Sequence, residues 1–422
     1  MDQKSKLVVI GGGAAGFFCA VNAARMSPAL EVIIVEKSNK LLSKVKVSGG
    51  GRCNVTHACF SIPEILTRYP RGVNFIKKSF YHFFTTDTIK WFEERGVKLK
   101  TEKDGRMFPV SNSSETIIQC LLDEAKKNDV SILTGHDVKH LYCDKQKWII
   151  EFMGAKKIEA DFICIACGGY PKSSMFEWMR GTGHTIEEPV PSLFSFNMPG
   201  DPVIDLMGVS VENAEVRIAG TKLIEKGPLM ITHWGMSGPV ILRLSAWGAR
   251  LLAARGQDYK FTIHVNWVSK FNENSMREKL LGLRDSSGSL RIGNRNPFEL
   301  PQRLWEYLLQ RSGINAEARW AEVSSTSQNK LVKNLCSHEY EVRGKTTFKE
   351  EFVTAGGVKL IEVDPNTMQS RLHPNLFFAG EVLDVDGITG GFNFQHAWTS
   401  GFVAAKTIAD FADLSGFRGS SS

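Results

Sequence analysis

A glycine-rich turn between an apolar strand and a helix constrains the fold of this chain more than any other feature. The segment KLVVIGGGAAGFFCAVNAARM (residues 6–26) places Gly11, Gly13 and Gly16 at G-x-G-x-x-G spacing, with Ala15 in the same turn. The first glycine permits the tight turn, the second lets a pyrophosphate approach the backbone, and the third allows close helix–strand packing. The pattern predicts a dinucleotide phosphate at the helix N-terminus.

An acidic residue at the end of the next strand strengthens this interpretation. EVIIVEK (residues 31–37) is an apolar strand that ends in Glu36 and Lys37, and Glu36 follows Gly16 by 20 residues. A carboxylate there can accept hydrogen bonds from both ribose hydroxyls and disfavours a 2′-phosphate. The alternative, a glycine turn followed by an ordinary surface glutamate, does not account for both features together. The pair does not separate NAD from FAD.

Composition indicates an ordinary globular protein with an anionic ligand. The 422 residues suggest two or three domains, and 52 basic against 45 acidic residues leave a net charge of +7. The chain has no dense Lys/Arg run, so nucleic acid is not a favoured partner. Neither a signal peptide nor an apolar run of ~18 residues is present, and the eight cysteines are scattered. We therefore expect a reduced, cytoplasmic protein without a membrane span; its oligomeric state is open.

The pattern of elements predicts an α/β nucleotide-binding domain that is split by an insert. Helices are expected at 85–95 and 113–127, and residues 37–54 read as a loop. Prolines at 189, 191 and 199 mark a domain crossing, after which strands at 203–220 and 259–268 alternate as in antiparallel sheet. We assign 1–190 and 352–422 to the nucleotide-binding domain. The insert, 191–351, comprises a β-rich unit (191–270 and 338–351) with a helical excursion (271–337).

A second glycine motif near the C-terminus selects FAD. LFFAGEVLDVD is an apolar strand ending in Gly380 and Glu381, and a helix (392–411) then opens at Gly390 and Gly391. This arrangement resembles the second FAD motif of the glutathione reductase-like superfamily. There the acid contacts the ribitol or pyrophosphate side, and the helix N-terminus faces the flavin N1–C2=O edge. That edge becomes negative on reduction, which a helix N-terminus stabilises.

Two further positions follow from the same resemblance. ICIACGG (163–169), which contains Gly168, is similar to the strand-to-turn segment that passes beneath the cofactor in that superfamily. Val138 matches the position whose backbone commonly holds the adenine.

Four motifs point to a closer family. VSGGGRCNVTH (47–57), ITHWGMSGPVIL (231–242), TAGGV (354–358) and GEVLDVDGITGGFNFQHAW (380–398) look like those of the YhiN/BaiN-type flavoproteins, described as NAD(P)/FAD-dependent oxidoreductases. The resemblance covers nearly the whole chain. It implies an α/β, Rossmann-like FAD-binding domain split by a β-barrel-like insert with a helical subdomain. Family members often carry Tyr or Leu where this chain has Phe392 and Phe394, which flank Asn393; the exchange keeps the apolar character.

The loop SGGGRCN supplies candidate site residues. Gly50 and Gly51 let backbone amides lie against a ligand, and Arg52 can neutralise a phosphate or carboxylate. By the resemblance, Arg52, Cys53 and Asn54 lie near the flavin, where Asn54 could hydrogen-bond the ring. Cys53 is either a packed thiol, which the residue type favours, or a redox thiol with a pKa lowered by Arg52.

A few other side chains are candidates for acid–base or redox chemistry. His233 precedes the turn 235–238 and is either a general acid or an interface residue that holds the turn. Cys164 and Cys167 form a C-x-x-C within a strand, where residues three apart point to opposite faces, so we do not expect a dithiol. His396 reads as packed in its helix. No histidine shows metal-ligand spacing, and no metal is expected.

These features predict an FAD-dependent oxidoreductase that transfers hydride through flavin N5. The chain lacks a second strand–GxGxxG–helix unit, so NAD(P)H, if used, binds transiently at the flavin face. The favoured reaction reduces an unsaturated small molecule with NAD(P)H. One alternative is an oxidase of an amine-like substrate that uses oxygen. Another is a tRNA-binding or tRNA-modifying flavoprotein, which predicts a basic patch beside the flavin. A non-catalytic nucleotide sensor would bind FAD without turnover.

Overall fold

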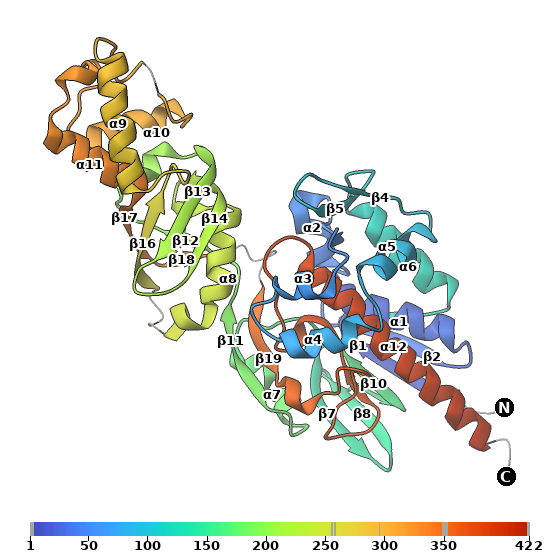
Figure 1. Cartoon of the computed structure of the whole chain (residues 1–422). Helices are drawn as coiled ribbons and strands as arrows, with labels where there is room; N and C mark the ends of the chain where they lie inside the picture. Colours follow the sequence, from blue (N-terminus) through green and yellow to red (C-terminus); the bar gives the residue numbers. More distant parts are fainter. Residues whose placement is uncertain (1–3, 255, 257–258, 295, 348–352, 420–422) are drawn as a thin grey trace. The chain divides into compact units, whose positions relative to one another are not determined.

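The computed structural model describes residues 4–254, 256, 259–294, 296–347 and 353–419. The chain forms two compact units, of which the first combines Met1–Ser192 with Lys349–Ser422 and the second is Leu193–Phe348. Figure 1 shows the N-terminal and C-terminal segments of the chain together in the first unit.

A five-stranded parallel sheet forms the centre of the first unit, in the order β20-β10-β1-β2-β6. Register pairs Val9 with both Ile34 and Cys164, so the first strand lies between the second and the tenth. The strands are rich in buried Val, Ile and Leu because both faces of such a sheet are covered. The five strands are β1 (Lys6–Ile10), β2 (Glu31–Glu36), β6 (Ser131–Thr134), β10 (Phe162–Ile165) and β20 (Leu376–Phe378).

Two helices from opposite ends of the chain pack together against this sheet. The helix α1 (Ala14–Met26) packs along α12 (Phe392–Gly419), as Figure 1 shows. A Cβ added at Gly401 would lie 2.7 Å from the carbonyl oxygen of Ala15, so the absent side chain lets the two helices approach closely. The rings of Phe18 and Trp398 fill the contact with centroids 5.2 Å apart. The first and last helices of the chain therefore form one layer.

The remaining elements of the first unit surround the sheet. Its further helices are α2 (Ser43–Gly51), α3 (Ile62–Leu66), α4 (Val73–Phe80), α5 (Thr85–Glu93), α6 (Glu115–Lys127), α7 (Glu177–Arg180) and the short 3₁₀ turns η1 (Ser173–Phe176), η4 (Leu360–Glu362) and η5 (Gly380–Val382). Its antiparallel strands are β3 (Thr56–His57), β4 (Leu99–Thr101), β5 (Arg106–Pro109), β7 (Val138–Asp144), β8 (Lys147–Phe152), β9 (Lys157–Ala160), β11 (Ile186–Pro191) and β19 (Thr354–Val358).

One local prediction in this unit is wrong. Residues 37–54 were expected as a loop, whereas Ser43–Gly51 forms α2. Its first turn is helical because Val45 buries a side chain there, and the helix is interrupted at Ser48, Gly49 and Gly50, where the backbone is not helical. Gly49 and Gly50 have φ of +59° and +68°, a region in which glycine has no steric penalty.

The second unit is a seven-stranded antiparallel sheet with helices. Its strands are β12 (Ser195–Asn197), β13 (Ser210–Ile218), β14 (Ile224–Thr232), β15 (Gly235–Ser237), β16 (Lys260–Asn266), β17 (His338–Arg343) and β18 (Lys345–Thr346), and its helices are α8 (Pro239–Ala254), α9 (Glu273–Ser287), α10 (Gln302–Arg311), α11 (Ser325–Cys336), η2 (Pro202–Leu206) and η3 (Trp320–Glu322). The start of the strand expected at 203–220 is instead η2, because Pro202 and the capping carboxylate of Asp201 begin a 3₁₀ turn.

Both ends of this sheet lie on one segment of chain. The strand order is β17-β16-β13-β14-β15-β12-β18, and only Gly344, with φ of +103°, separates the first strand from the last. Segment 338–346 therefore pairs with β16 through β17 and with β12 through β18. Inside lies a continuous apolar core that includes Ile231, Trp267 and Tyr340.

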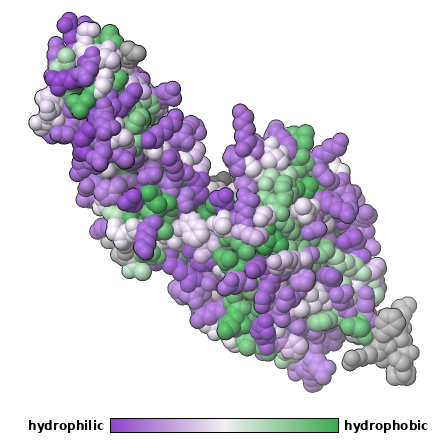
Figure 2. Space-filling model, viewed as in Figure 1, coloured by the Kyte–Doolittle hydropathy of each residue, from purple (hydrophilic) through white to green (hydrophobic). Residues whose placement is uncertain are grey.

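The visible face of the second unit is mostly polar (Figure 2). Figure 2 shows hydrophilic residues over most of the visible face of the 193–348 unit. Within the described part of the chain, no helix is long and apolar enough to cross a bilayer.

Candidate cofactor site

The first glycine turn leaves the N-terminus of α1 open. A Cβ on Gly11 would lie 2.4 Å from the oxygen of Ala166, and one on Gly16 would lie 1.9 Å from the oxygen of Gly11. Both positions therefore require glycine for packing. A Cβ on Gly13 would meet nothing within 4 Å, and this residue caps α1 without a side-chain hydrogen bond. Gly13 is half-buried. The free amides of a helix N-terminus with open space beside it are suited to an anion such as a pyrophosphate.

The acid predicted for the ribose is held beside this turn. Glu36 Oε2 accepts a 2.9 Å hydrogen bond from Gly12 N, and its Oε1 accepts from the amide and the hydroxyl of Ser38, also at 2.9 Å. These donors fix the carboxylate at the carboxyl end of β2. Lys37 is exposed, and its Nζ lies 5.0 Å from the ring centroid of Tyr170.

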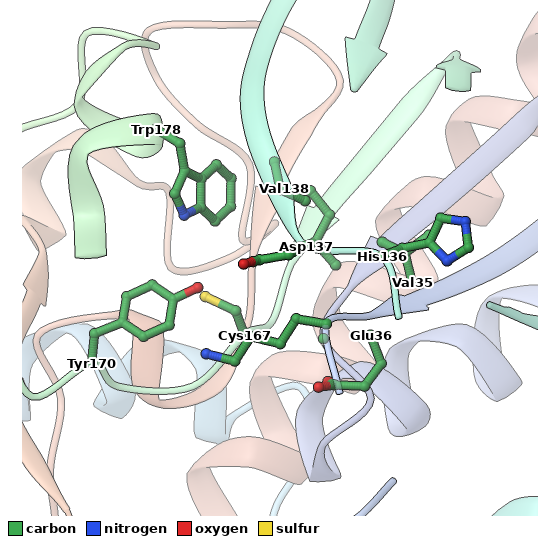
Figure 3. Close-up of a pocket in the computed structure, with 11 residues that line it drawn as sticks. Val35, Glu36, His136, Asp137, Val138, Cys167, Tyr170 and Trp178 are labelled. Carbon is green, nitrogen blue, oxygen red and sulfur yellow. The ribbon is translucent and has the colours of Figure 1, made fainter. Parts of the chain in front are cut away.

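A pocket opens next to Glu36, beside the carboxyl ends of β1 and β2 and the segments that follow β6 and β10 (Figure 3). Val138, the predicted adenine position, lines it at the start of β7. Trp178 of α7 and Tyr170 from the turn after β10 present aromatic rings to the same space. The full lining is Ile10, Gly11, Val35, Glu36, Lys37, His136, Asp137, Val138, Cys167, Tyr170 and Trp178. The sequence analysis missed Tyr170 and Trp178, because no spacing rule links them to the fingerprint.

The SGGGRCN loop does not present Arg52 as the free cation that the sequence suggested. Gly50 and Gly51 are exposed, and a Cβ at either would meet nothing within 4 Å. Arg52 does not present a free charge, because its Nη1 lies 2.6 Å from Glu102 Oε1 and its guanidinium lies 4.0 Å above the ring centroid of Phe108. A phosphate or substrate carboxylate would have to compete with Glu102 for Arg52.

Cys53 and Asn54 lie on the inner side of this loop. Cys53 is fully buried, and burial raises the pKa of its thiol to about 12. The thiol is therefore protonated at neutral pH, which favours the packed interpretation over the redox one. Asn54 is also buried; in the amide orientation that satisfies both of its polar atoms, it donates to Thr56 O and accepts from Gly391 N, each at 3.0 Å.

The second glycine motif packs directly against the first. A Cβ on Gly380 would lie 2.7 Å from the Cβ of Ala15, so this glycine is needed for close approach to α1. Glu381 Oε2 lies 2.6 Å from Lys44 Nζ, and Glu381 Oε1 accepts a 2.9 Å hydrogen bond from Thr354 N. The buried hydroxyl of Thr354 has no hydrogen-bond partner among the described residues. An orphaned buried hydroxyl beside Glu381 fits a region that a polar ligand completes.

The turn after β10 adds to this region. Gly168 has φ of +77° and open space above its Cα, and Gly169 packs against Thr354. Cys167 lies beyond the end of β10, in the pocket lining, whereas Cys164 is buried within the strand. The two thiols thus point into different surroundings, although Cys167 is not in the strand as expected.

The helix α12 follows a glycine pair whose backbone has positive φ. Gly390 and Gly391 have φ of +133° and +95°, and a Cβ at Gly391 would lie 2.6 Å from the carbonyl of Thr56. The Asn393 side chain closes this turn by bonding both the amide and the carbonyl of Gly387, and Phe394 stacks on Trp398 with centroids 5.7 Å apart. The first turn of α12 carries no acidic residue.

Side chains from residues 57–71 hold this turn, and the sequence analysis did not single them out. His57 Nδ1 lies 3.0 Å from Gly390 O, and its ring stacks on that of Phe392 with centroids 4.7 Å apart. Tyr69 Oη donates a 2.7 Å hydrogen bond to Phe392 O. Asp386, fully buried, forms an ion pair with Arg71. Spacing could not reveal these contacts, since each joins positions more than 300 residues apart.

A comparison with known protein families shows the family of this chain. The chain matches the HI0933-like protein Rossmann domain family over residues 5–407. It belongs to this family. The prediction of a Rossmann-like FAD-dependent oxidoreductase is thereby confirmed at the level of fold and enzyme class.

Two curated relatives match almost end to end. A 3-dehydro-bile acid delta(4,6)-reductase of Clostridium scindens is 26% identical over 414 residues, covering 96% of this chain and 99% of the relative. A ribosomal RNA dihydrouridine synthase of Escherichia coli is 27% identical over 417 residues, covering 96% and 98%. Among solved structures, an E. coli quinol fumarate reductase subunit resembles this fold with a TM-score of 0.50 at 14% identity, covering 98% of this chain and 71% of that one.

The remaining predicted residue lies in the other unit. His233 is exposed in the turn between β14 and β15, with its ring 4.2 Å from that of Trp234. Its role as an acid stays a prediction. Among the residues that the structure describes, no group of three or more His, Cys, Asp and Glu side chains is placed to hold a metal ion.

Proposed function

We propose that this family member uses FAD to reduce a carbon–carbon double bond conjugated to a carbonyl group, with NAD(P)H as the hydride source. The observation that carries the proposal is the chemistry shared by two relatives. One name describes reduction of ring double bonds in a 3-oxo bile acid, and the other describes formation of dihydrouridine from uridine. Each reaction adds a hydride and a proton across a double bond next to a carbonyl.

The geometry of the first unit supports FAD as the cofactor. The open amides at Gly13 would hold the pyrophosphate, Glu36 the ribose hydroxyls, and the backbone of Val138 the adenine, with the rings of Tyr170 and Trp178 beside it. Glu381, next to the orphaned Thr354 hydroxyl, would contact the ribitol or pyrophosphate side. When bound, FAD supplies two-electron transfer at its N5 atom.

The turn Gly390–Phe394 would form the flavin end of the site. A helix N-terminus carries a partial positive charge, and no acidic side chain in the first turn of α12 offsets it. Asn54, His57 and Tyr69 hold the backbone of this turn, so it needs little rearrangement to stabilise negative charge. Asn54 acts in this proposal through Gly391 and not as a free donor to the ring.

A base within RNA is a second candidate substrate. The observation that favours it is the ribosomal RNA dihydrouridine synthase among the relatives. Charge is consistent with it, because residues 193–348 hold 20 Lys and Arg against 15 Asp and Glu, and so carry +5 of the net +7. RNA binding of this kind weakens steeply with salt. The oxidase alternative gains nothing from the names of these relatives, which describe reductions.

The decisive experiment is anaerobic. The purified protein would be loaded with FAD, its spectrum recorded, and NADH and NADPH added separately. The expected result is loss of the flavin absorbance near 450 nm, followed by reoxidation on addition of a 3-oxo-4-ene steroid or of uridine-containing RNA. A flavin that neither nicotinamide reduces, or that only oxygen reoxidises, contradicts the proposal.

The choice between substrates can be made in the same assay. Mass spectrometry would detect two added hydrogens in the steroid or in a nucleoside of the digested RNA. Reduction of the steroid alone favours the small-molecule function, and reduction of RNA that disappears between 50 and 300 mM salt favours the second candidate. Heat-denatured protein with free FAD is the control.

The architecture of residues 191–351 is part of the same proposal. The sheet of this unit begins and ends on segment 338–346, which supports a barrel-like insert, and α9, α10 and α11 form its helical subdomain. Expression of residues 193–348 alone, tested by cooperative unfolding, would show whether the insert folds independently.

A further inference from the structure

His57 occupies a distinctive place at the start of α12. It lies on β3. Its Nδ1 lies 3.0 Å from the carbonyl oxygen of Gly390, just before α12, and its ring stacks on Phe392, the first residue of α12. Because a carbonyl only accepts hydrogen bonds, Nδ1 carries the proton of the neutral ring. Nε2 is then the atom that can take up a further proton. A Cβ on Gly105 would lie 2.5 Å from Nε2, so glycine at 105 makes room for the ring.

The surroundings of the His57 ring act on its pKa in opposite directions, and burial has the largest effect. Burial lowers the pKa of His57 below 6.5, and the positive charge of Arg68 acts in the same direction. The hydrogen bond to the carbonyl of Gly390 opposes this shift most, followed by the carboxylates of Asp104 and Glu64. Arg106, opposite His57 in the β3–β5 pair, is itself paired with Asp104 and Glu102. A ring in such a position is neutral near pH 7 and gains a proton readily when a negative charge forms nearby.

We propose that His57 is a proton-linked positioning residue: it holds the Gly390 turn while neutral, and it takes up a proton when the bound flavin becomes negatively charged on reduction. The inference rests on the proposed function, which places the flavin end of FAD at the N-terminus of α12. In the balanced step, two electrons and one proton from an external two-electron donor reduce the flavin to its anion. A second proton, from solvent, is bound at Nε2 of His57 without any covalent change.

The proton count gives a readout that is independent of turnover. Uptake of one proton with two electrons gives a fixed slope of midpoint potential against pH, and uptake of two protons doubles it. The FAD-loaded protein would be titrated with dithionite and reference dyes between pH 5.5 and 8.5. The variants are His57→Asn, which offers an amide donor but does not titrate, and His140→Asn, which removes an exposed histidine of β7.

The expected result is a segment of doubled slope in the wild type and in His140→Asn that is absent from His57→Asn. Equal slopes in all three proteins would overturn the inference while leaving the proposed function intact. A protein that cannot be loaded with FAD would instead overturn the proposed function and this inference with it.

A second measurement covers the case in which His57→Asn fails to retain FAD. The wild-type protein, labelled with ¹⁵N at its histidine rings, would be titrated by NMR in the oxidised and reduced states. The His57 signal is identified as the one that is missing from the spectrum of FAD-free His57→Asn. Its titration midpoint should lie at a higher pH in the reduced state than in the oxidised state. An unchanged midpoint would overturn the proposal.

Discussion

The hydroxyl of Tyr69 donates a 2.7 Å hydrogen bond to the carbonyl oxygen of Phe392, a residue 323 positions later in the chain. Both groups are buried, and the phenol ring also packs edge-on against Phe392 with centroids 6.1 Å apart. The bond joins the segment after α3 to the first residue of α12. The start of the helix proposed for the flavin is therefore held by a tertiary contact.

Removing this hydroxyl should destabilise the protein. Tyr69→Phe leaves the carbonyl of Phe392 buried without its partner, which costs about 1–3 kcal/mol in the free energy of unfolding. Urea unfolding followed by circular dichroism measures the effect. Tyr81→Phe is the matched control, because Tyr81 is 70% exposed and should change stability little. Equal stability of the two variants would contradict the role assigned to Tyr69.

Two glycines of the fingerprint should separate folding from ligand binding. Gly13→Ala places its Cβ in open space, so the melting temperature should be unchanged while the Kd for FAD rises roughly tenfold or more, about 1.4 kcal/mol. Gly16→Ala places its Cβ 1.9 Å from Gly11 O and should lower the melting temperature and abolish FAD binding. Calorimetry and FAD titration check both. A Gly13→Ala protein with wild-type affinity would argue against a phosphate at that turn.

The carboxylate of Glu36 should be required for tight cofactor binding. Glu36→Gln keeps the size of the side chain but replaces one acceptor oxygen with a donor, which conflicts with the amide of Gly12 and the donors of Ser38. We expect FAD affinity to fall by roughly tenfold or more, about 1.4 kcal/mol. Glu31→Gln, at the other end of β2 and exposed, is the control. Isothermal titration of the FAD-free proteins gives both constants.

Cys53 should be dispensable for chemistry. Its buried thiol has a pKa raised to about 12, so it is not a thiolate at neutral pH. Cys53→Ala should keep the rate of flavin reduction within about twofold, apart from a packing cost in stability. In the folded protein, iodoacetamide should modify the exposed Cys143 before Cys53, as peptide mapping would show. Loss of flavin reduction in a folded Cys53→Ala protein would restore the redox interpretation.

Stability should fall in mild acid because of buried histidines. Burial lowers the pKa of His184 and of His396 to about 4. A histidine whose folded pKa lies below its unfolded value of about 6.5 binds more protons when unfolded, so stability is complete above pH 6.5 and is lost as pH falls toward 4. Each such group contributes a slope of up to about 1.4 kcal/mol per pH unit in that window.

The histidine prediction can be checked by urea unfolding at pH 5, 6 and 7. His184→Gln should flatten the pH dependence, although it disturbs bonds to Thr182 and Ser370 and so lowers stability at pH 7 as well. His140→Gln, which changes an exposed histidine, should leave the slope unchanged. A slope that is the same in all three proteins would show that the acid sensitivity arises elsewhere.

Local pattern in the sequence determined the nucleotide-binding core. The spacing of Gly11, Gly13 and Gly16, and the position of Glu36 after an apolar strand, reflect steric and hydrogen-bond requirements within a single βαβ unit, so they are visible without a structure. The second motif at Gly380–Glu381 was identified by its resemblance to a known FAD motif, because its glycine packs against Ala15, which lies far away in the chain. Local pattern was wrong at residues 43–51, where a helix begins at Ser43 with Val45 buried and is interrupted at Ser48, Gly49 and Gly50.

Only the tertiary structure decided which side chains serve the site. Arg52 is a free cation by sequence, yet folding pairs it with Glu102. Tyr69 belongs to none of the motifs, and His57 is only the last residue of the 47–57 motif. Folding brings both residues against the turn at 390–392. The cause is the same in each case. Short-range spacing encodes the geometry of one strand, turn or helix, whereas the partner of a polar side chain is set by segments that meet only when the whole sheet is assembled.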